Sequence, residues 1–250
     1  MLRVDNLDKS FGGIHAVRNC SISVEEGTIT GLIGPNGAGK TTLFNLITGF
    51  HEPDSGRVYF KDEDITELTP HEIFDKNLFR TFQITREIQE MTVLENLMLI
   101  PRNQSGEKLW NTWFNSNLIG KQEDDHERTA LEVLDFLEME DRKYDLAKNL
   151  PGGEKKLLDL GRMMMAEPEM VLLDEPGSGV PPSLQTKVNN HVRDISEEQG
   201  ITFLVVEHDM NIIMDLCDPI IVLVDGEKLT KGTPEEVRNN EQVIEAYLGS

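Results

Sequence analysis

The chain has 250 residues, and its 24 Lys and Arg against 45 Asp and Glu give a formal net charge of −21. That length allows one substantial core, or one large lobe with a smaller subdomain, and so acidic a surface disfavours nucleic acid as a partner because it would repel phosphate backbones. The two distant cysteines, Cys20 and Cys217, favour a reducing, cytosolic compartment, and no apolar run reaches the ~18 residues that crossing a bilayer requires.

The N-terminal part of the chain is predicted to contain short strands. Alternating or continuous apolar residues predict strands at 2–4, 20–24, 28–33 and 57–60. Apolar side chains at helical spacing predict a helix over 42–47. Thr69-Pro-His-Glu72 is typical of a capped helix start, with proline at the first position and Glu at the third.

The rest of the chain is predicted to be helical first and then to alternate strands with helices. Apolar residues three and four apart predict helices within 92–99 and 127–137, and strands return at 170–173, 201–206 and 219–224. Thr233-Pro-Glu-Glu236 repeats the capped helix start. Buried strands between helices predict an α/β fold, in which a helical subdomain over about 84–165 interrupts a core made of 1–83 and 166–250.

A glycine-rich stretch, Gly34-Pro-Asn-Gly-Ala-Gly-Lys-Thr41, fits the phosphate loop pattern at every fixed position. It lies between a predicted strand and a predicted helix, which is the context that the motif needs. Backbone N–H groups and the helix N-terminus would face the phosphates, Lys40 would reach the β and γ phosphates, and Thr41 would ligate Mg²⁺. The predicted nucleotide-binding residues are Gly34, Pro35, Asn36, Gly37, Ala38, Gly39, Lys40, Thr41 and Thr42.

A second motif, Val171-Leu-Leu-Asp-Glu-Pro176, places two carboxylates at the end of a predicted buried strand. Ligand sites of α/β proteins lie at the carboxyl ends of the strands. Asp174 is predicted to hold Mg²⁺, directly or through water, and Glu175 to act as the general base that polarises the attacking water.

Three single residues fit the same site, and each also has a plain structural interpretation. Gln83 would sense Mg²⁺ or water, or is an ordinary surface residue. His208, after a predicted strand, would donate to the γ-phosphate, or is structural. Phe11 would stack on the base of the nucleotide, or is a core aromatic.

A second glycine pair occurs in Leu150-Pro-Gly-Gly-Glu154, ahead of a helix predicted to begin at Lys155. Backbone N–H groups at a helix start again offer contacts to phosphate. Because one nucleotide cannot easily use two such loops, this one is predicted to serve a nucleotide held by another subunit. Its candidate residues are Leu150, Pro151, Gly152, Gly153 and Glu154.

The order and spacing of these motifs along the whole chain resemble the ATPase subunit of ABC transporters. The resemblance implies a P-loop NTPase core, a mostly parallel sheet with an antiparallel β subdomain, plus an inserted helical subdomain. It implies ATP and Mg²⁺ as ligands, with Thr41, Gln83 and Asp174 at the metal. It also implies a head-to-tail dimer, in which ATP lies between one subunit's phosphate loop and the other's 150–154 loop.

Four segments resemble more narrowly the LivG-type ATPases of branched-chain amino acid importers. They are Gly31–Phe50, Arg80–Gln83, Met91–Leu97 and Ala246–Gly249. The aromatic stretch Trp110-Asn-Thr-Trp-Phe114 fits as well, either packing a helical subdomain or facing a membrane subunit. This resemblance implies ATP hydrolysis that drives uptake of a branched-chain amino acid through separate permease subunits, with a substrate-binding protein as an indirect partner. The subunit would lie at the cytoplasmic face of the membrane.

Two prolines depart from the superfamily pattern. Pro151 stands where most members have Ser, and Pro181 where Asp is usual. Proline offers neither a hydroxyl nor an N–H, which weakens this chain's support for a partner's ATP and favours a non-identical partner ATPase. The alternatives are transport of urea, short amides or lipopolysaccharide, and a soluble role in translation, DNA repair or iron–sulfur assembly.

Overall fold

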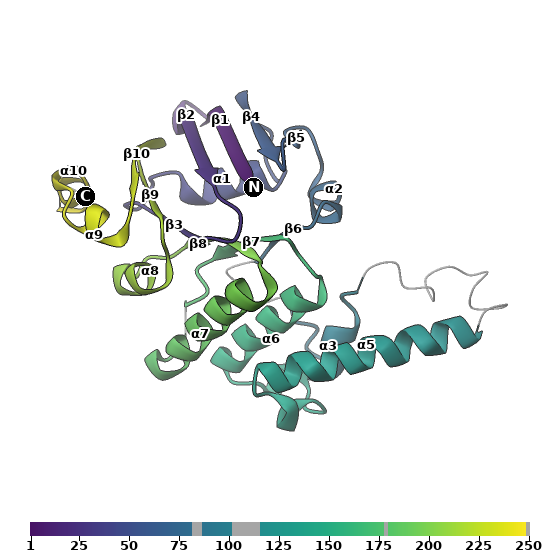
Figure 1. Cartoon of the computed structure of the whole chain (residues 1–250). Helices are drawn as coiled ribbons and strands as arrows, with labels where there is room; N and C mark the ends of the chain where they lie inside the picture. Colours follow the sequence, from purple (N-terminus) through teal and green to yellow (C-terminus); the bar gives the residue numbers. More distant parts are fainter. Residues whose placement is uncertain (82–86, 102–115, 178–179, 249–250) are drawn as a thin grey trace. The chain divides into compact units, whose positions relative to one another are not determined.

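The computed structural model describes residues 1–81, 87–101, 116–177 and 180–248 (Figure 1). The chain divides into two compact units. The first consists of Met1–Gln83, Glu169–Gly177 and Asn189–Ser250, and the second of Ile84–Pro168 and Ser178–Val188.

The first unit contains a six-stranded, mostly parallel sheet with the strand order β10-β9-β3-β8-β7-β6. Only the β10–β9 pair is antiparallel within it. Its strands are β3 (Ile29–Ile33), β6 (Leu78–Arg80), β7 (Met170–Asp174), β8 (Thr202–Val206), β9 (Ile220–Val224) and β10 (Glu227–Gly232). The four strands predicted from continuous apolar runs are confirmed, whereas β6 and β10 were not predicted. Every residue of β7 and β8 is buried, as expected for central parallel strands covered on both faces.

A four-stranded antiparallel sheet, ordered β2-β1-β4-β5, completes the sheets of this unit. Its strands are β1 (Leu2–Phe11), β2 (Ile14–Val24), β4 (Ser55–Phe60) and β5 (Glu63–Asp64). The strands predicted at 2–4 and 20–24 are shorter than β1 and β2, because irregular pairing hides the alternation of apolar and polar residues in the sequence. The register shifts between Val4 and Leu7, where Asn6 has a φ of +47°.

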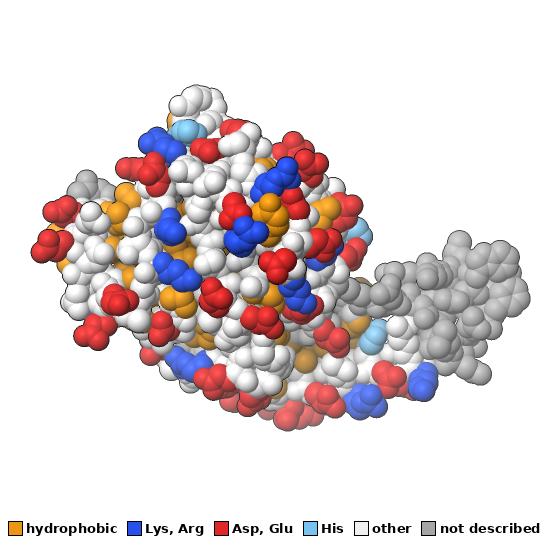
Figure 2. Space-filling view, turned by 45° about the horizontal axis from the view of Figure 1, so that its top comes forward, with side chains coloured by type: hydrophobic (Ala, Val, Ile, Leu, Met, Phe, Trp, Pro, Cys, Tyr) orange, Lys and Arg blue, Asp and Glu red, His pale blue; other side chains and the backbone are white. Residues whose placement is uncertain are grey.

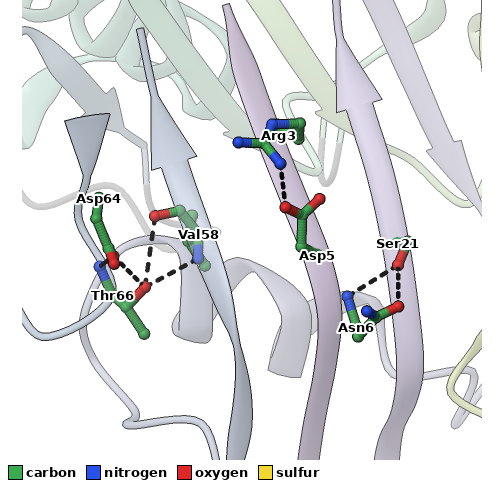
Figure 3. Close-up of polar contacts among 7 residues, drawn as sticks. All are labelled: Arg3, Asp5, Asn6, Ser21, Val58, Asp64 and Thr66. Atoms are coloured by element: carbon green, nitrogen blue, oxygen red, sulfur yellow. Dashed lines mark hydrogen bonds and ion pairs between the residues drawn. The ribbon is translucent and has the colours of Figure 1, made fainter. Parts of the chain in front are cut away.

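Side chains support this sheet where its backbone is irregular (Figure 3). The N–H of Asn6 donates to Ser21 Oγ at 2.8 Å, and Ser21 Oγ contacts Asn6 Oδ1 at 3.1 Å. Near the other edge, the N–H of Val58 donates to Thr66 Oγ1 at 2.9 Å. Local side chains thus take over backbone hydrogen-bonding partners at these points.

Helix α1 (Lys40–Ile47) begins two residues before the predicted start and carries the apolar face that joins the two sheets. Leu43, Phe44, Leu46 and Ile47 are buried in one cluster with residues of both sheets. The cluster includes Val4 and Phe60 of the antiparallel sheet and Leu32, Leu172 and Leu204 of the parallel sheet. Because α1 starts at Lys40, within the phosphate loop motif, this packing fixes the direction in which the loop faces.

Three short helices begin with complete capping boxes. Thr69, Thr92 and Thr233 are the N-caps of α2 (Pro70–Asp75), α3 (Val93–Met98) and α9 (Pro234–Arg238). In each, the threonine hydroxyl accepts from the backbone N–H three residues later, and the Glu at that position accepts from the backbone N–H of the threonine. The capped starts predicted at Thr69 and Thr233 are confirmed. Helices α8 (Met210–Leu216) and α10 (Glu241–Leu248) also belong to the first unit.

The second unit is helical. Its described residues contain α3, α5 (Ser116–Phe136), α6 (Gly152–Met165), two single 3₁₀ turns and the first part of α7 (Pro182–Gln199). Helices α3, α5 and α6 all contact one another. A Cβ on Gly161 of α6 would lie 3.0 Å from side-chain atoms of both Leu97 and Leu137, so glycine permits this close approach. No helix in the described ranges is both long and apolar enough to cross a membrane.

On the face shown in Figure 2, Asp and Glu side chains are spread among fewer Lys and Arg, in keeping with the net charge of −21. We expect the melting temperature to rise between low and molar KCl, because at about 1 M salt the Debye length is only ~3 Å and repulsion within a net charge of −21 is screened. Differential scanning fluorimetry in KCl and in tetramethylammonium chloride at equal ionic strength separates screening from specific binding of K⁺. A flat or falling melting temperature in both salts contradicts the prediction.

Candidate functional site

The candidate site lies in the first unit, at the carboxyl ends of three neighbouring strands. In the ladder, Val206 of β8 is paired with Leu32 of β3 on one side and with Asp174 of β7 on the other. The phosphate loop follows β3 and Glu175 follows β7 directly. His208 is the second residue after the end of β8. The register thus brings the phosphate loop, Glu175 and His208 to the same end of the parallel strands, where ligand sites of such sheets lie.

The phosphate loop is held against its neighbours so closely that two of its glycines cannot be replaced. A Cβ on Gly34 would lie 2.1 Å from the carbonyl oxygen of Leu223, and one on Gly39 would lie 2.3 Å from that of Ala16. Gly39 is also the N-cap of α1, in the left-handed conformation, and no side chain caps this helix start. The first backbone N–H groups of α1 are therefore available to donate to an anionic ligand, and a phosphate group would fit this helix start.

Lys40 is turned back onto this loop. Its Nζ donates to the carbonyl oxygens of Gly34 at 2.7 Å and Pro35 at 3.1 Å, and the residue is buried. Burial lowers the pKa of the ammonium group, and the charge of Glu175 partly opposes that shift. These two hydrogen bonds place the ammonium group of Lys40 at the loop. Phosphate oxygens could accept the same hydrogen bonds in place of the two carbonyl oxygens.

Asp174 is paired with an arginine that the sequence analysis did not identify as a site residue. Arg80, at the end of β6, donates from Nη2 to Asp174 Oδ2 at 2.9 Å, and the two side chains are only 8% and 9% exposed. Arg80 Nη1 also donates to Asn45 Oδ1 of α1 at 2.6 Å. The guanidinium lies 5.7 Å from the ring centroids of both Phe44 and Phe50. Arg80 therefore links the acidic strand end to the helix that follows the phosphate loop.

Replacing Arg80 with Met is expected to lower the free energy of unfolding by about 3–5 kcal/mol, because it removes the cation that faces a buried carboxylate. Urea unfolding of the two proteins at neutral pH measures the difference. The matched control is Arg57→Met, whose ion pair with Asp64 is exposed and whose loss should change stability little. Equal, small effects of both substitutions contradict a structural role for the Arg80–Asp174 pair.

Glu175 and His208 meet in a side-chain contact across the two neighbouring strand ends, which is an ion pair when the imidazole is protonated. His208 Nε2 contacts Glu175 Oε1, with the imidazole 53% exposed and the carboxylate 14% exposed. Glu175 has a φ of +51°, and its N–H donates to the carbonyl oxygen of Val206 at 2.9 Å. A left-handed conformation is uncommon for a residue other than glycine, and such residues gather at functional sites.

Of the other residues singled out in the sequence, Phe11 lies within the described part of the chain. Phe11 is 41% exposed at the end of β1, so it is not a core aromatic. Its ring makes an edge contact with His51 at 5.2 Å between centroids and lies 5.5 Å from Lys9 Nζ. Gln83 and the stretch from Trp110 to Phe114 lie outside the described residues, as does Gly249.

The 150–154 segment belongs to the second unit, and one prediction about it was wrong. Helix α6 begins at Gly152, with Pro151 as its N-cap, and not at Lys155. Both glycines lie in the first turn, and a Cβ on Gly153 would lie 2.0 Å from a side-chain carbon of Leu184, so glycine permits this close approach. Glu154 is in the first turn, 3.5 Å from Arg142 Nε. No side-chain cap hydrogen bond is made at this helix start.

A glycine loop between β3 and α1, with two carboxylates at the end of a nearby parallel strand, defines a phosphate-loop nucleoside triphosphatase. Comparisons with known proteins give the family. Residues 17–178 match the ABC transporter family, and residues 227–250 match the family described as branched-chain amino acid ATP-binding cassette transporter.

One relative is the probable branched-chain amino acid transport ATP-binding protein LivG of Methanocaldococcus jannaschii, 42% identical over 253 residues that cover 100% of this chain and 97% of the relative. The ADP conformation of an ATP-binding cassette of an ABC transporter is 38% identical, with a TM-score of 0.84 and coverage of 100% of this chain and 99% of that structure. A dimeric, post-hydrolysis cassette bound to ADP and Pi is 26% identical, with a TM-score of 0.76 over 94% of this chain and 99% of that one. The present chain belongs to the ABC transporter family as an ATP-binding subunit, and it is an ATPase.

Proposed function

We propose that this chain is the subunit that hydrolyses ATP to power an importer of branched-chain amino acids. The observation that carries the chemistry is the meeting of Glu175 and His208 beside the phosphate loop and Asp174. The cargo rests on the full-length likeness to LivG and on the match over 227–250.

The phosphate loop residues 34–42 bind the triphosphate of ATP in this proposal, and Phe11 stacks on the adenine. Lys40 leaves the carbonyl oxygens of Gly34 and Pro35 for the β and γ phosphates, where it gains two charge-assisted hydrogen bonds. Thr41, Asp174 and Gln83 would hold Mg²⁺, Asp174 directly or through water, consistent with the preference of this ion for few protein oxygens and for substrate phosphates. The ion neutralises charge on the phosphates when bound.

Glu175 acts as the general base in this proposal: it accepts a proton from the water that attacks the γ-phosphorus of ATP. His208, whose Nε2 contacts Glu175 in the unliganded chain, would donate a hydrogen bond to a γ-phosphate oxygen when ATP is bound. The left-handed backbone at Glu175 aims the carboxylate, since the hydrogen bond to Val206 fixes the main chain there. The bond between the γ-phosphorus and the β–γ bridging oxygen breaks, so the products are ADP and phosphate.

The site is completed by a second ATPase subunit, which binds head-to-tail. The segment Leu150–Glu154 serves the partner's ATP through backbone N–H groups at the start of α6, because no side chain caps that helix. Permease subunits carry the amino acid across the membrane, and this chain lies at their cytoplasmic face. A substrate-binding protein delivers the cargo to the permeases.

The function is tested by reconstituting the chain with its permeases, its sister ATPase and its binding protein in proteoliposomes. We expect ATP-dependent uptake of labelled leucine, isoleucine or valine, and no uptake without ATP. Uptake of urea or a short amide in place of these amino acids would overturn the proposed cargo. Hydrolysis that needs neither permease nor cargo would indicate a role outside transport.

The purified chain by itself is expected to be mostly monomeric and a poor ATPase, because each complete site needs a partner's 150–154 segment. Pro151 lacks the hydroxyl that would strengthen that segment, which favours a non-identical partner. Light scattering and a phosphate-release assay, with and without the sister subunit, measure both properties. A stable homodimer that hydrolyses ATP as fast as the mixed pair contradicts this prediction.

A further inference from the structure

A buried carboxylate that the sequence motifs do not include connects two segments of the site. Glu207 lies between the end of β8 and His208, and it is only 6% exposed. Its Oε1 accepts from the backbone N–H of Gly177 at 2.5 Å, and its Oε2 accepts from the backbone N–H of His208 at 3.2 Å. Each carboxylate oxygen therefore holds the main chain of a different segment.

The two segments are those that carry the ion pair of the site. Gly177 lies two residues after Glu175, and His208 is the partner of Glu175. Glu175 and His208 are thus connected twice, once directly between side chains and once through the main chain by way of Glu207. Three contacts, between Glu175 and His208, Glu207 and Gly177, and Glu175 and Val206, tie the ends of β7 and β8 together. The hydrogen bond from the N–H of His208 to Glu207 adds a fixed main chain on the β8 side.

The charge of Glu207 is unfavourable in itself. Burial raises the pKa of this carboxyl group, and the nearby charge of Glu175 raises it further, whereas the two backbone hydrogen bonds and His208 lower it. If the position served only to fill space, a neutral apolar residue would avoid the free-energy cost of burying a charged carboxylate. What the carboxylate offers is two acceptor oxygens at fixed separation, each able to take a charge-assisted hydrogen bond.

We propose that Glu207 is a positioning residue that keeps the main chain after Glu175 and the main chain of His208 in fixed register, and thereby aligns the Glu175–His208 pair for hydrolysis. This inference rests on the proposed function of that pair. Glu207 contacts no substrate in this scheme. It acts on the rate of the chemical step, where a displacement of ~1 Å can cost about 10²-fold, and leaves nucleotide binding at the phosphate loop unaffected.

The first test is Glu207→Gln in the assembled transporter. The amide keeps one acceptor oxygen, but its NH₂ group faces a backbone N–H and cannot accept from it. We expect kcat to fall by about 10–100-fold while the Kd for Mg-ATP changes less than about 2-fold. The matched control is Glu236→Gln, since Glu236 also accepts from a backbone N–H, that of Thr233, in a capping box away from the site. It should leave kcat unchanged.

The second test reads the hydrogen bonds themselves, without turnover. Amide hydrogen exchange in the chain without nucleotide should be faster at Gly177 and His208 in Glu207→Gln than in the unaltered protein. If Glu207→Gln does not fold, Glu207→Asp, which keeps the charge but is one methylene shorter, is measured in the same way and should also lose kcat and protection.

A kcat within about 2-fold of the unaltered protein for the folded variant overturns the inference. So does a parallel loss of kcat and Mg-ATP affinity, which would show general disruption. An unaltered transporter that hydrolyses no ATP refutes the proposed function instead. In that case the exchange rates still decide whether Glu207 holds the two segments, and unchanged rates at Gly177 and His208 overturn that too.

Discussion

Replacing Glu175 with Gln is expected to lower ATP hydrolysis by about 10²–10⁴-fold, the usual contribution of a general base. The amide cannot accept a proton from water, and it removes the carboxylate charge that faces His208. The side chain keeps its size, so the left-handed backbone at position 175 and the hydrogen bond to Val206 are retained. Affinity for Mg-ATP should therefore be preserved, and ATP should stay bound.

Single-turnover and steady-state assays of the assembled transporter, together with calorimetry of Mg-ATP binding, measure these two effects separately. Glu169→Gln is the matched control, because Glu169 immediately precedes β7 and Glu175 immediately follows it. Glu169 pairs with Lys61 and Asn77, so the control removes a charge from the same strand without touching the site. Turnover by Glu175→Gln at the rate of this control would remove Glu175 from the role of base.

The central strands of the parallel sheet could be predicted because their burial is nearly the same along the whole element. The strands β7, β8 and β9 are covered on both faces, so continuous apolar runs mark them. Strand β10 has no such run, since Glu, Lys and Thr dominate an edge strand whose partner, β9, supplies the pairing. The start of α6 was misplaced because two glycines locally disfavour a helix, and the close approach of Gly153 to Leu184 exists only in the folded chain.

Some residues of the site could likewise be found from the sequence, and others could not. Motifs whose members are adjacent in the chain, such as 34–41 and 171–176, could be found from spacing alone. Arg80 and Glu207 could not, because their partners Asp174 and Gly177 lie 94 and 30 positions away. An arginine beside a short apolar strand and a glutamate before a histidine carry no local signal. Their importance comes from burial and from the register of β6, β7 and β8, which only the folded chain supplies.

Replacing Lys40 with Ala is expected to weaken Mg-ATP binding by about 10²-fold or more. The ammonium group is proposed to donate to both the β and γ phosphates, and each hydrogen bond to a charged group contributes ~1.5–3 kcal/mol. The unliganded protein should lose little stability. The bonds of Lys40 to Gly34 and Pro35 are offset by the cost of burying its charge, which also lowers its pKa.

Isothermal titration calorimetry gives the Kd, and thermal unfolding with and without Mg-ATP gives an independent measure, since a ligand that binds only the folded state raises the melting temperature. Lys76→Ala is the matched control: Lys76 pairs with Glu63 on the surface, and its loss should leave both the Kd and the nucleotide-dependent shift unchanged. If Lys40→Ala bound Mg-ATP as tightly as this control, the Gly34–Thr41 loop would not be the triphosphate site. If it failed to fold without nucleotide, the contacts of Lys40 to the loop carbonyls would be structural, because those two bonds would then outweigh the burial of the charge.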